Sequence, residues 1–136
     1  MATYNGEKYL REQVDSLLAQ SYPSLEFIFV DDASSDGSHA ILQQYASQDE
    51  RIRLIANPVN PGLLATFEGG IREAKGELIA LSDQDDVWMP NKISLLAAAI
   101  SRNSMIYADS ALTNSEGNVT GKFSDRNHLG DYPTVL

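Results

Sequence analysis

Hydrophobic residues form two kinds of pattern along the chain: a helical repeat and short continuous runs. Between Gly6 and Ser21, Leu10, Val14 and Leu17 fall on one face of a helix. Leu25–Val30 is a short run rich in β-branched and aromatic residues, which predicts a strand. The same reasoning predicts helices at 38–48, 63–74 and 90–101, and strands at 52–55, 77–82 and 104–108. A hairpin turn is expected around 115–118, and a polar tail after residue 122.

Predicted helices and strands alternate from Gly6 to Ala108. This order favours an α/β fold, with a mostly parallel, doubly wound sheet covered by helices on both faces. We expect residues 1–136 to form a single domain. Little strand precedes the turn at Tyr4 and little follows the hairpin, so we expect part of a larger domain, truncated at both ends.

An acidic cluster follows the apolar segment 78–81. Asp83, Asp85 and Asp86 lie within four residues, with Gln84 between the first two. We expect a buried strand to carry these carboxylates at its carboxyl end. Because like charges this close repel one another, a cation or hydrogen-bond donors are expected there. Mg²⁺ or Mn²⁺ prefers carboxylate oxygens and shares its ligand shell with substrate phosphates. The alternative is an acidic loop that caps the helix beginning at Pro90.

A second acidic pair, Asp31 and Asp32, follows the first predicted strand. A carboxylate at this position can accept a hydrogen bond from the imide N–H of uracil or thymine. The alternative is a polar turn. Ligands bind beyond the carboxyl ends of parallel strands, so the two acidic groups are expected to share one cleft if both strands are central.

Two further segments have both a binding and a structural interpretation. The ring of Tyr4 could stack on a nucleobase, or pack half-buried under the sheet. The segment 60–62, Asn-Pro-Gly, could bring backbone close to a phosphate at a helix N-terminus, or simply connect two elements. Trp88 is expected in the core or in a pocket wall, and neither His39 nor His128 is given a role.

Composition narrows the classes of partner. The 136 residues carry a formal net charge of −9, which argues against nucleic acid as a partner because phosphates need Lys and Arg. Hydrophobic residues make up 43% of the chain, but no run reaches the roughly 18–20 residues of a membrane span. No signal peptide is recognisable and cysteine is absent. We expect a soluble domain.

Five short segments together resemble the family 2 inverting glycosyltransferases, which have the GT-A fold. They are Thr3–Gly6 with Tyr9 and Leu10, Val30–Gly37, Asn60–Gly62, Ala74–Glu77, and Ser82–Trp88 with Pro90 and Lys92. Each segment is weak evidence alone, but their order and separations together are specific. The last segment is similar to bacterial enzymes that build surface polysaccharide, some of which transfer rhamnose.

The resemblance implies transfer of a sugar, with inversion, from a UDP- or dTDP-sugar to a hydroxyl of a saccharide or lipid-linked saccharide. Tyr4 would stack on the base and Asp32 would bind its imide edge. Asp83 would reach the ribose or the diphosphate, and Asp85 would hold Mg²⁺ or Mn²⁺ together with Asp83. The donor-binding residues implied in this way are Thr3, Tyr4, Asn5, Asp32, Gly62, Asp83 and Gln84. The expected location is cytoplasmic, including the inner face of the membrane.

The chain also departs from the family pattern. The family begins with a full apolar strand, here reduced to Met1-Ala2, and its catalytic base lies well downstream of the acidic motif. Inverting transfer needs a base, and we assign that role to no residue of this chain. We therefore expect the donor-binding half, weakly active or inactive alone.

Three other functions fit parts of the sequence. A receiver domain could use Asp83 or Asp85 as phospho-acceptor, but a helix precedes its acidic strand and the later Lys-Pro is missing. A nucleotidyltransferase would need a Gly-rich basic loop near the start, which segment 3–8 lacks. A non-catalytic nucleotide-binding fragment is the third alternative.

Overall fold

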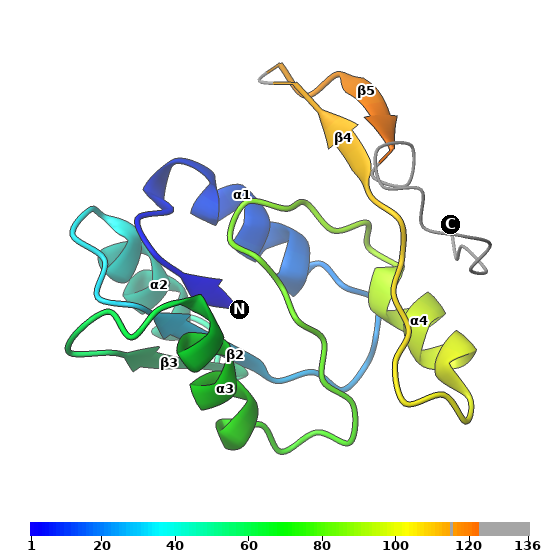
Figure 1. Ribbon diagram of the computed structural model, residues 1–136, viewed down its shortest axis with the longest axis horizontal. Coiled ribbons are helices and arrows are strands. Elements are labelled where there is room, and N and C mark those ends of the chain that lie inside the picture. Colours follow the sequence, from blue (N-terminus) through cyan, green and yellow to red (C-terminus); the bar gives the residue numbers. More distant parts are fainter. Residues whose placement is uncertain (115, 123–136) are drawn as a thin grey trace. The chain divides into compact units, whose positions relative to one another are not determined.

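The computed structural model describes residues 1–114 and 116–122 (Figure 1). The chain forms two compact units, Met1–Ile93 and Ser94–Leu136. The predicted polar tail and His128 lie outside the described residues.

The first unit is built on a three-stranded parallel sheet in the order β1-β2-β3. The strands are β1 (Ala2–Thr3), β2 (Phe27–Asp31) and β3 (Ile52–Ala56). Ala2 lies opposite Val30, and Phe27 opposite Ile52. Since all three strands are parallel, their carboxyl ends meet at one edge, where ligands bind in sheets of this kind.

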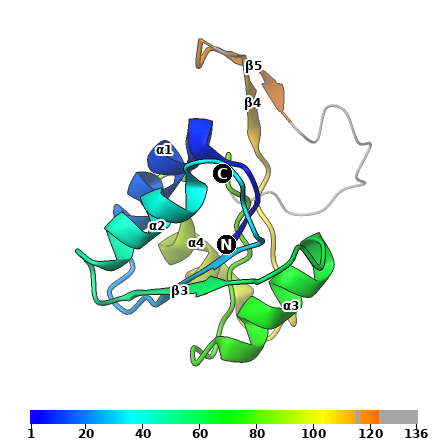
Figure 2. The same ribbon diagram turned by 90° about the vertical axis from the view of Figure 1, so that its left-hand side faces the viewer.

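Three helices cover the two faces of this sheet: α1 (Glu7–Leu18), α2 (Ser38–Ala46) and α3 (Leu63–Glu73). Figure 2 shows α1 and α2 on one side of the sheet and α3 on the other. Successive side chains of a strand point to opposite faces, so Phe27 and Phe29 join the core under α1 and α2. Val30 points the other way: a Cβ added at Gly70 of α3 would lie 3.1 Å from its Cγ2. The predicted α/β architecture with helices on both faces is confirmed.

The predicted inner face of α1 is confirmed as core. Leu10, Val14 and Leu17 are buried together with Phe29 and Leu42. Full burial of each such side chain contributes about 1.5–3 kcal/mol, and this packing fixes α1 against the sheet. Trp88 belongs to the same cluster, in agreement with the core interpretation of this residue.

The strand predicted at 77–82 is wrong. This segment has no strand in the structure, and Leu78, Ile79 and Leu81 are each more than half exposed rather than buried. A strand needs a partner of similar length for its backbone hydrogen bonds. The neighbouring edge is β1, which is only two residues long, so an apolar run of this length has no ladder to join.

The second unit contains most of α4 (Lys92–Ile100) and a hairpin of β4 (Ala111–Thr113) and β5 (Val119–Lys122). The two strands are antiparallel and the turn includes Gly117 with φ +81°, so the predicted hairpin is confirmed. The strand predicted at 104–108 is wrong, because β4 and β5 pair with each other and neither pairs with this segment.

In the described part of the chain, no helix combines the length and the apolar character that crossing a bilayer requires.

Candidate functional site

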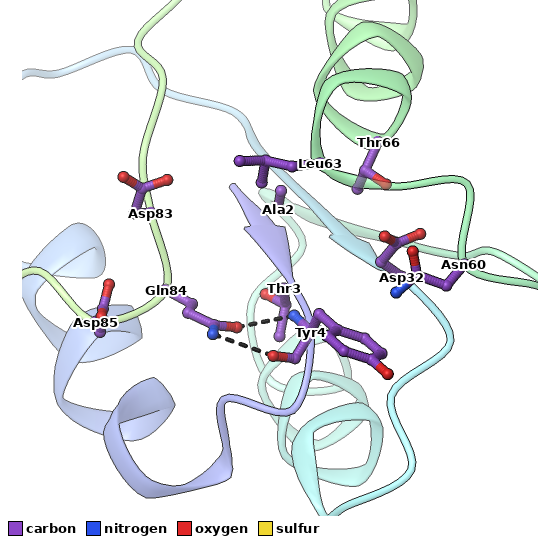
Figure 3. Close-up of a pocket in the computed structure, with 10 residues that line it drawn as sticks. All are labelled: Ala2, Thr3, Tyr4, Asp32, Asn60, Leu63, Thr66, Asp83, Gln84 and Asp85. Atoms are coloured by element: carbon purple, nitrogen blue, oxygen red, sulfur yellow. Dashed lines mark hydrogen bonds between the residues drawn. The ribbon is translucent and has the colours of Figure 1, made fainter.

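A pocket of about 310 Å³ opens at the carboxyl edge of the sheet (Figure 3). It is lined by Ala2, Thr3, Tyr4, Asp32, Asn60, Leu63, Thr66, Asp83, Gln84 and Asp85. Asp32 lies on one side of β1, and Asp83 and Asp85 lie on the other. Members of both acidic groups therefore line one crevice, although the second group lies on an irregular segment and not at the end of a central strand, the condition on which this expectation rested.

The turn after β1 presents an aromatic ring at the pocket. Tyr4 is 49% exposed and lines the pocket, so it does not pack under the sheet. Thr3 is buried beside it, and its Oγ1 has no hydrogen-bond partner among the described residues. An unpaired buried hydroxyl at a pocket wall costs free energy unless a ligand or water binds it. Thr3 and Tyr4 therefore both line the pocket, and their contact with a ligand stays a prediction.

Asn5 has a different environment from its neighbours. Its backbone φ is +49°, and its Oδ1 accepts a hydrogen bond from the Ser35 backbone N–H at 2.8 Å. Its own N–H donates to Ser34 Oγ at 3.0 Å. Asn5 is not among the residues that line the pocket. It joins the β1–α1 turn to the β2–α2 loop, and so shapes the site from outside.

The two acids after β2 have separate roles. Asp31 is buried and does not line the pocket; its carboxylate accepts from the Ser34 backbone N–H at 3.3 Å and lies 3.0 Å from His39 Nδ1. For Asp31 the turn interpretation is therefore right. Asp32 is also buried but lines the pocket, and its Oδ1 accepts a hydrogen bond from Asn57 Nδ2 at 2.9 Å. The sequence analysis missed Asn57, whose only signal was a position shortly after β3.

Asp83 and Asp85 form the acidic side of the pocket. The pKa of Asp83 is raised, first by partial burial and then by the negative charges of Asp86 and Asp85. None of the described residues that line the pocket is Lys or Arg. An anionic ligand would therefore meet three carboxylates and no side-chain cation.

The donor set of this pocket fits a hard divalent cation. Within the described ranges, no group of three or more His, Cys, Asp or Glu side chains is arranged to hold a metal ion, so a cation in this pocket would also need ligands from the substrate. Mg²⁺ is commonly bound by one or two carboxylates together with substrate phosphates. Asp83 and Asp85 supply that number of carboxylates, and a bound cation would relieve the repulsion that raises the pKa of Asp83.

Side chains of α1 hold the acidic segment in place. Gln13 is fully buried, and its Nε2 donates to Ser82 Oγ at 2.6 Å. Ser82 Oγ in turn donates to the Asp83 carbonyl at 3.0 Å. Farther along the helix, Ser16 Oγ accepts from the Trp88 backbone N–H at 3.0 Å. Gln20 continues this row with bonds to the carbonyl of Met89 and the N–H of Ile93. These hydrogen bonds hold Ser82, the last residue of the predicted strand, and the segment after it at Trp88, Met89 and Ile93.

These residues carry a signal that the sequence analysis did not use. Gln13 and Ser16 of α1 and Gln20, two residues beyond its end, are spaced by three and four residues, so they form a polar stripe beside the apolar face. A buried polar stripe on a helix needs partners, and the acidic segment supplies them.

Of the two remaining predicted residues, Gly62 and Gln84, only Gln84 lines the pocket. Gly62 precedes α3 with φ +91°, and its carbonyl accepts from the Thr66 backbone N–H at 3.0 Å, but it does not line the pocket. Its neighbours Asn60 and Leu63 do. Gln84 lines the pocket, and its amide forms two hydrogen bonds with the backbone of Tyr4, drawn as dashed lines in Figure 3.

Two solved structures match this fold. A mannosyltransferase from Pyrobaculum calidifontis, in complex with GDP-Man and Mn²⁺, matches with a TM-score of 0.71 at 23% identity over 83% of this chain and 34% of its own. TarS of S. aureus in complex with UDP-GlcNAc matches with a TM-score of 0.66 at 29% identity over 74% of this chain and 30% of its own. The fold is that of the GT-A glycosyltransferases.

Sequence comparison identifies the family. The profile described as "Glycosyl transferase family 2" matches residues 1–134. A putative teichuronic acid biosynthesis glycosyltransferase, TuaG of Bacillus subtilis, is 40% identical over 91 residues, which is 67% of this chain and 36% of that protein. This chain belongs to glycosyl transferase family 2. It spans about a third of the length of these relatives.

Proposed function

We propose that this chain is the donor-binding part of a glycosyltransferase that moves a sugar, with inversion, from a UDP- or dTDP-sugar to an acceptor hydroxyl. The observation that carries the proposal is one pocket that is lined by an exposed aromatic ring, a buried carboxylate and the acidic segment. A nucleoside diphosphate needs these three features in that order: a stacking surface, an acceptor for the base, and a charge partner for the phosphates.

The base end of the donor is assigned to Tyr4 and Asp32. The Tyr4 ring offers a flat apolar face, and stacking of a base on an aromatic side chain contributes about 1–3 kcal/mol. Asn57 occupies one hydrogen-bonding position of the Asp32 carboxylate, which leaves acceptor capacity for the imide N–H of uracil or thymine. UDP and dTDP present the same imide edge, so both remain in the proposal.

The phosphate end is assigned to Asp83 and Asp85. These two carboxylates would hold Mg²⁺ or Mn²⁺, which supplies neutralisation of the leaving diphosphate when bound. Thr3 lines the same pocket, and its buried Oγ1 has no hydrogen-bond partner among the described residues. The acceptor oxygen forms its bond to the anomeric carbon as the bond to the diphosphate breaks, and its proton must pass to a base. We assign that base to no residue of this chain.

The acceptor is proposed to be a saccharide or a lipid-linked saccharide, in the cytoplasm or at the inner face of the membrane. The name of the Bacillus subtilis relative, which refers to teichuronic acid biosynthesis, supports a role in bacterial surface polysaccharide. Whether the sugar is a hexose or rhamnose is left open in this proposal.

Titration calorimetry of UDP and dTDP, each with and without Mn²⁺, tests the proposal. We expect binding that Mn²⁺ strengthens in the unmodified protein and that loses this dependence in Asp85→Ala. Glu50→Ala is the matched control, because it removes one exposed carboxylate that does not line the pocket. Equal binding with and without metal would remove Asp85 from its role, and failure of both nucleotides to bind would overturn the proposed function.

A further inference from the structure

Gln84 bridges the two ends of the pocket through the backbone of Tyr4. Its Oε1 accepts a hydrogen bond from the Tyr4 N–H at 2.8 Å, and its Nε2 donates to the Tyr4 carbonyl at 3.1 Å. Both bonds are drawn in Figure 3, where the Gln84 side chain points across to the turn that follows β1. The two residues are 80 positions apart in the sequence.

A side-chain amide is suited to this contact because it carries the same donor and acceptor as a peptide group. Tyr4 follows directly after β1, whose paired neighbour is β2. The Gln84 amide pairs with both the N–H and the carbonyl of Tyr4, as the backbone of a neighbouring strand would. Two bonds to one residue fix both the position and the orientation of that residue more strongly than a single bond can.

A second, independent observation shows that the turn is shaped around this side chain. A Cβ added at Gly6 would lie 2.5 Å from Gln84 Oε1 and 2.7 Å from its Cδ. A distance below 3.0 Å requires one group to move. The absence of a side chain at Gly6 therefore leaves the space in which the Gln84 amide reaches Tyr4.

We propose that Gln84 is a positioning residue that orients Tyr4 as the stacking surface for the nucleobase, instead of contacting the donor through its own amide. This inference rests on the proposed function for the identity of the ligand. Each polar atom of the Gln84 amide has one hydrogen bond to the Tyr4 backbone, and together these bonds fix the amide in an orientation set by Tyr4.

The key variant is Gln84→Met, which keeps the length of the side chain and removes both hydrogen-bonding groups. Gln43→Met in α2 is the matched control, because Gln43 is exposed and does not line the pocket. We expect Gln84→Met to lower the affinity for uridine by about fivefold or more, since 1–2 kcal/mol of lost orientation corresponds to a factor of roughly 5–30. The affinity for pyrophosphate with Mn²⁺ should change less than twofold, because that ligand has no base.

A double-mutant cycle separates orientation of Tyr4 from general damage. In a Tyr4→Ala background, Gln84→Met should cause no further loss of uridine affinity, because no ring remains to be oriented. Gly6→Ala should reproduce the Gln84→Met phenotype from a different element. Equal uridine affinity in the unmodified protein and Gln84→Met would overturn the inference, as would additive losses in the cycle.

Hydrogen exchange of the Tyr4 amide gives a readout that does not depend on any ligand. We expect faster exchange at Tyr4 in Gln84→Met than in Gln43→Met or the unmodified protein. Unchanged exchange would overturn the inference even if nucleotides bind. If exchange accelerates but the unmodified protein binds neither UDP nor dTDP, the proposed function fails, and the assignment of Tyr4 as a base-stacking surface is overturned with it.

Discussion

Asn57 holds the buried carboxylate of Asp32 by a hydrogen bond of 2.9 Å from its Nδ2 to Asp32 Oδ1. Asn57 follows β3 directly and Asp32 follows β2, so the bond joins the ends of two neighbouring strands. It fixes which part of the Asp32 carboxylate is left for a ligand.

Replacement of Asn57 by Leu should therefore weaken nucleotide binding without touching the ligand directly. Hydrogen bonds to charged groups contribute about 1.5–3 kcal/mol, so we expect a UDP affinity at least about tenfold lower and a folding stability lower by about 1–3 kcal/mol. Calorimetry and thermal unfolding measure the two effects. Asn103→Leu, at an exposed position in the second unit, is the control. Unaltered UDP affinity in a folded Asn57→Leu protein would contradict this prediction.

Gln13 should control the metal-dependent part of nucleotide binding. Its bond to Ser82 Oγ, and the bond from Ser82 to the Asp83 carbonyl, fix the peptide where the acidic segment begins. In Gln13→Leu, which has similar volume, we expect the gain in UDP affinity on adding Mn²⁺ to fall about fivefold, because about 1 kcal/mol of positioning is lost.

Uridine affinity should be unaffected by Gln13→Leu, because uridine lacks the phosphates that need the cation. In the same titrations, Ser82→Ala should also lower the gain in UDP affinity on adding Mn²⁺, but by less than Gln13→Leu does. If Mn²⁺ strengthens UDP binding as much in Gln13→Leu as in the unmodified protein, the α1 bonds do not position the acidic segment.

Two glycines near α3 should respond to alanine in opposite directions. Gly62 has φ +91°, where a side chain is strained, although nothing lies within 4 Å of its added Cβ. Gly62→Ala should therefore lower the free energy of unfolding by about 1–2 kcal/mol through backbone strain alone. Gly69 lies inside α3 and also has open space around its Cβ. Gly69→Ala should raise stability by about 0.5–1 kcal/mol, because alanine has the better helix propensity. Urea unfolding of both variants measures the difference, and equal effects would contradict the assigned strain.

The acidic segment should make stability depend on pH. The pKa of Asp83 is raised above its ordinary 3.8 by partial burial, then by Asp86 and Asp85. A carboxyl group whose pKa is higher in the folded state favours folding when protonated, so its contribution declines as pH rises from 3.8 through the raised pKa. Above that range the charged group costs stability. Solvent screening keeps the cost small, since the burial of Asp83 is only partial and the residue remains in contact with solvent.

Asp83→Asn should accordingly be slightly more stable than the unmodified protein at neutral pH and equally stable below pH 3.8. Thermal unfolding across this range measures the effect. Asp86→Asn is the matched control, because it removes one of the repelling charges without removing a pocket carboxylate. It should also stabilise the protein while preserving Mn²⁺-dependent UDP binding, whereas Asp83→Asn should lose that dependence. A lower stability of Asp83→Asn at neutral pH would show that the carboxylate has a compensating partner.

The sequence alone determined the elements whose pattern is local. Leu10, Val14 and Leu17 repeat at helical spacing, so α1 and its buried face follow from periodicity. The first four residues of β2 (Phe27–Asp31) are β-branched or aromatic, and this local composition favours a buried strand. The family likewise follows from the order and the separations of five short motifs along the chain.

The tertiary structure decided what depends on distant partners. The apolar run 78–81 has strand composition, yet β1 is too short to pair with it, and α1 holds only the residues that follow the run, Ser82 and Trp88. Asp31 contacts His39, whereas Asp32 accepts a hydrogen bond from Asn57 and lines the pocket. No local pattern in the sequence links these partners to the two acids. Gln84 lies in the motif that indicated donor binding, but its contact with Tyr4 bridges 80 residues. Hydrogen bonds between segments far apart in sequence form only when folding brings their donors and acceptors together. Those bonds fix the positions of the side chains in this pocket.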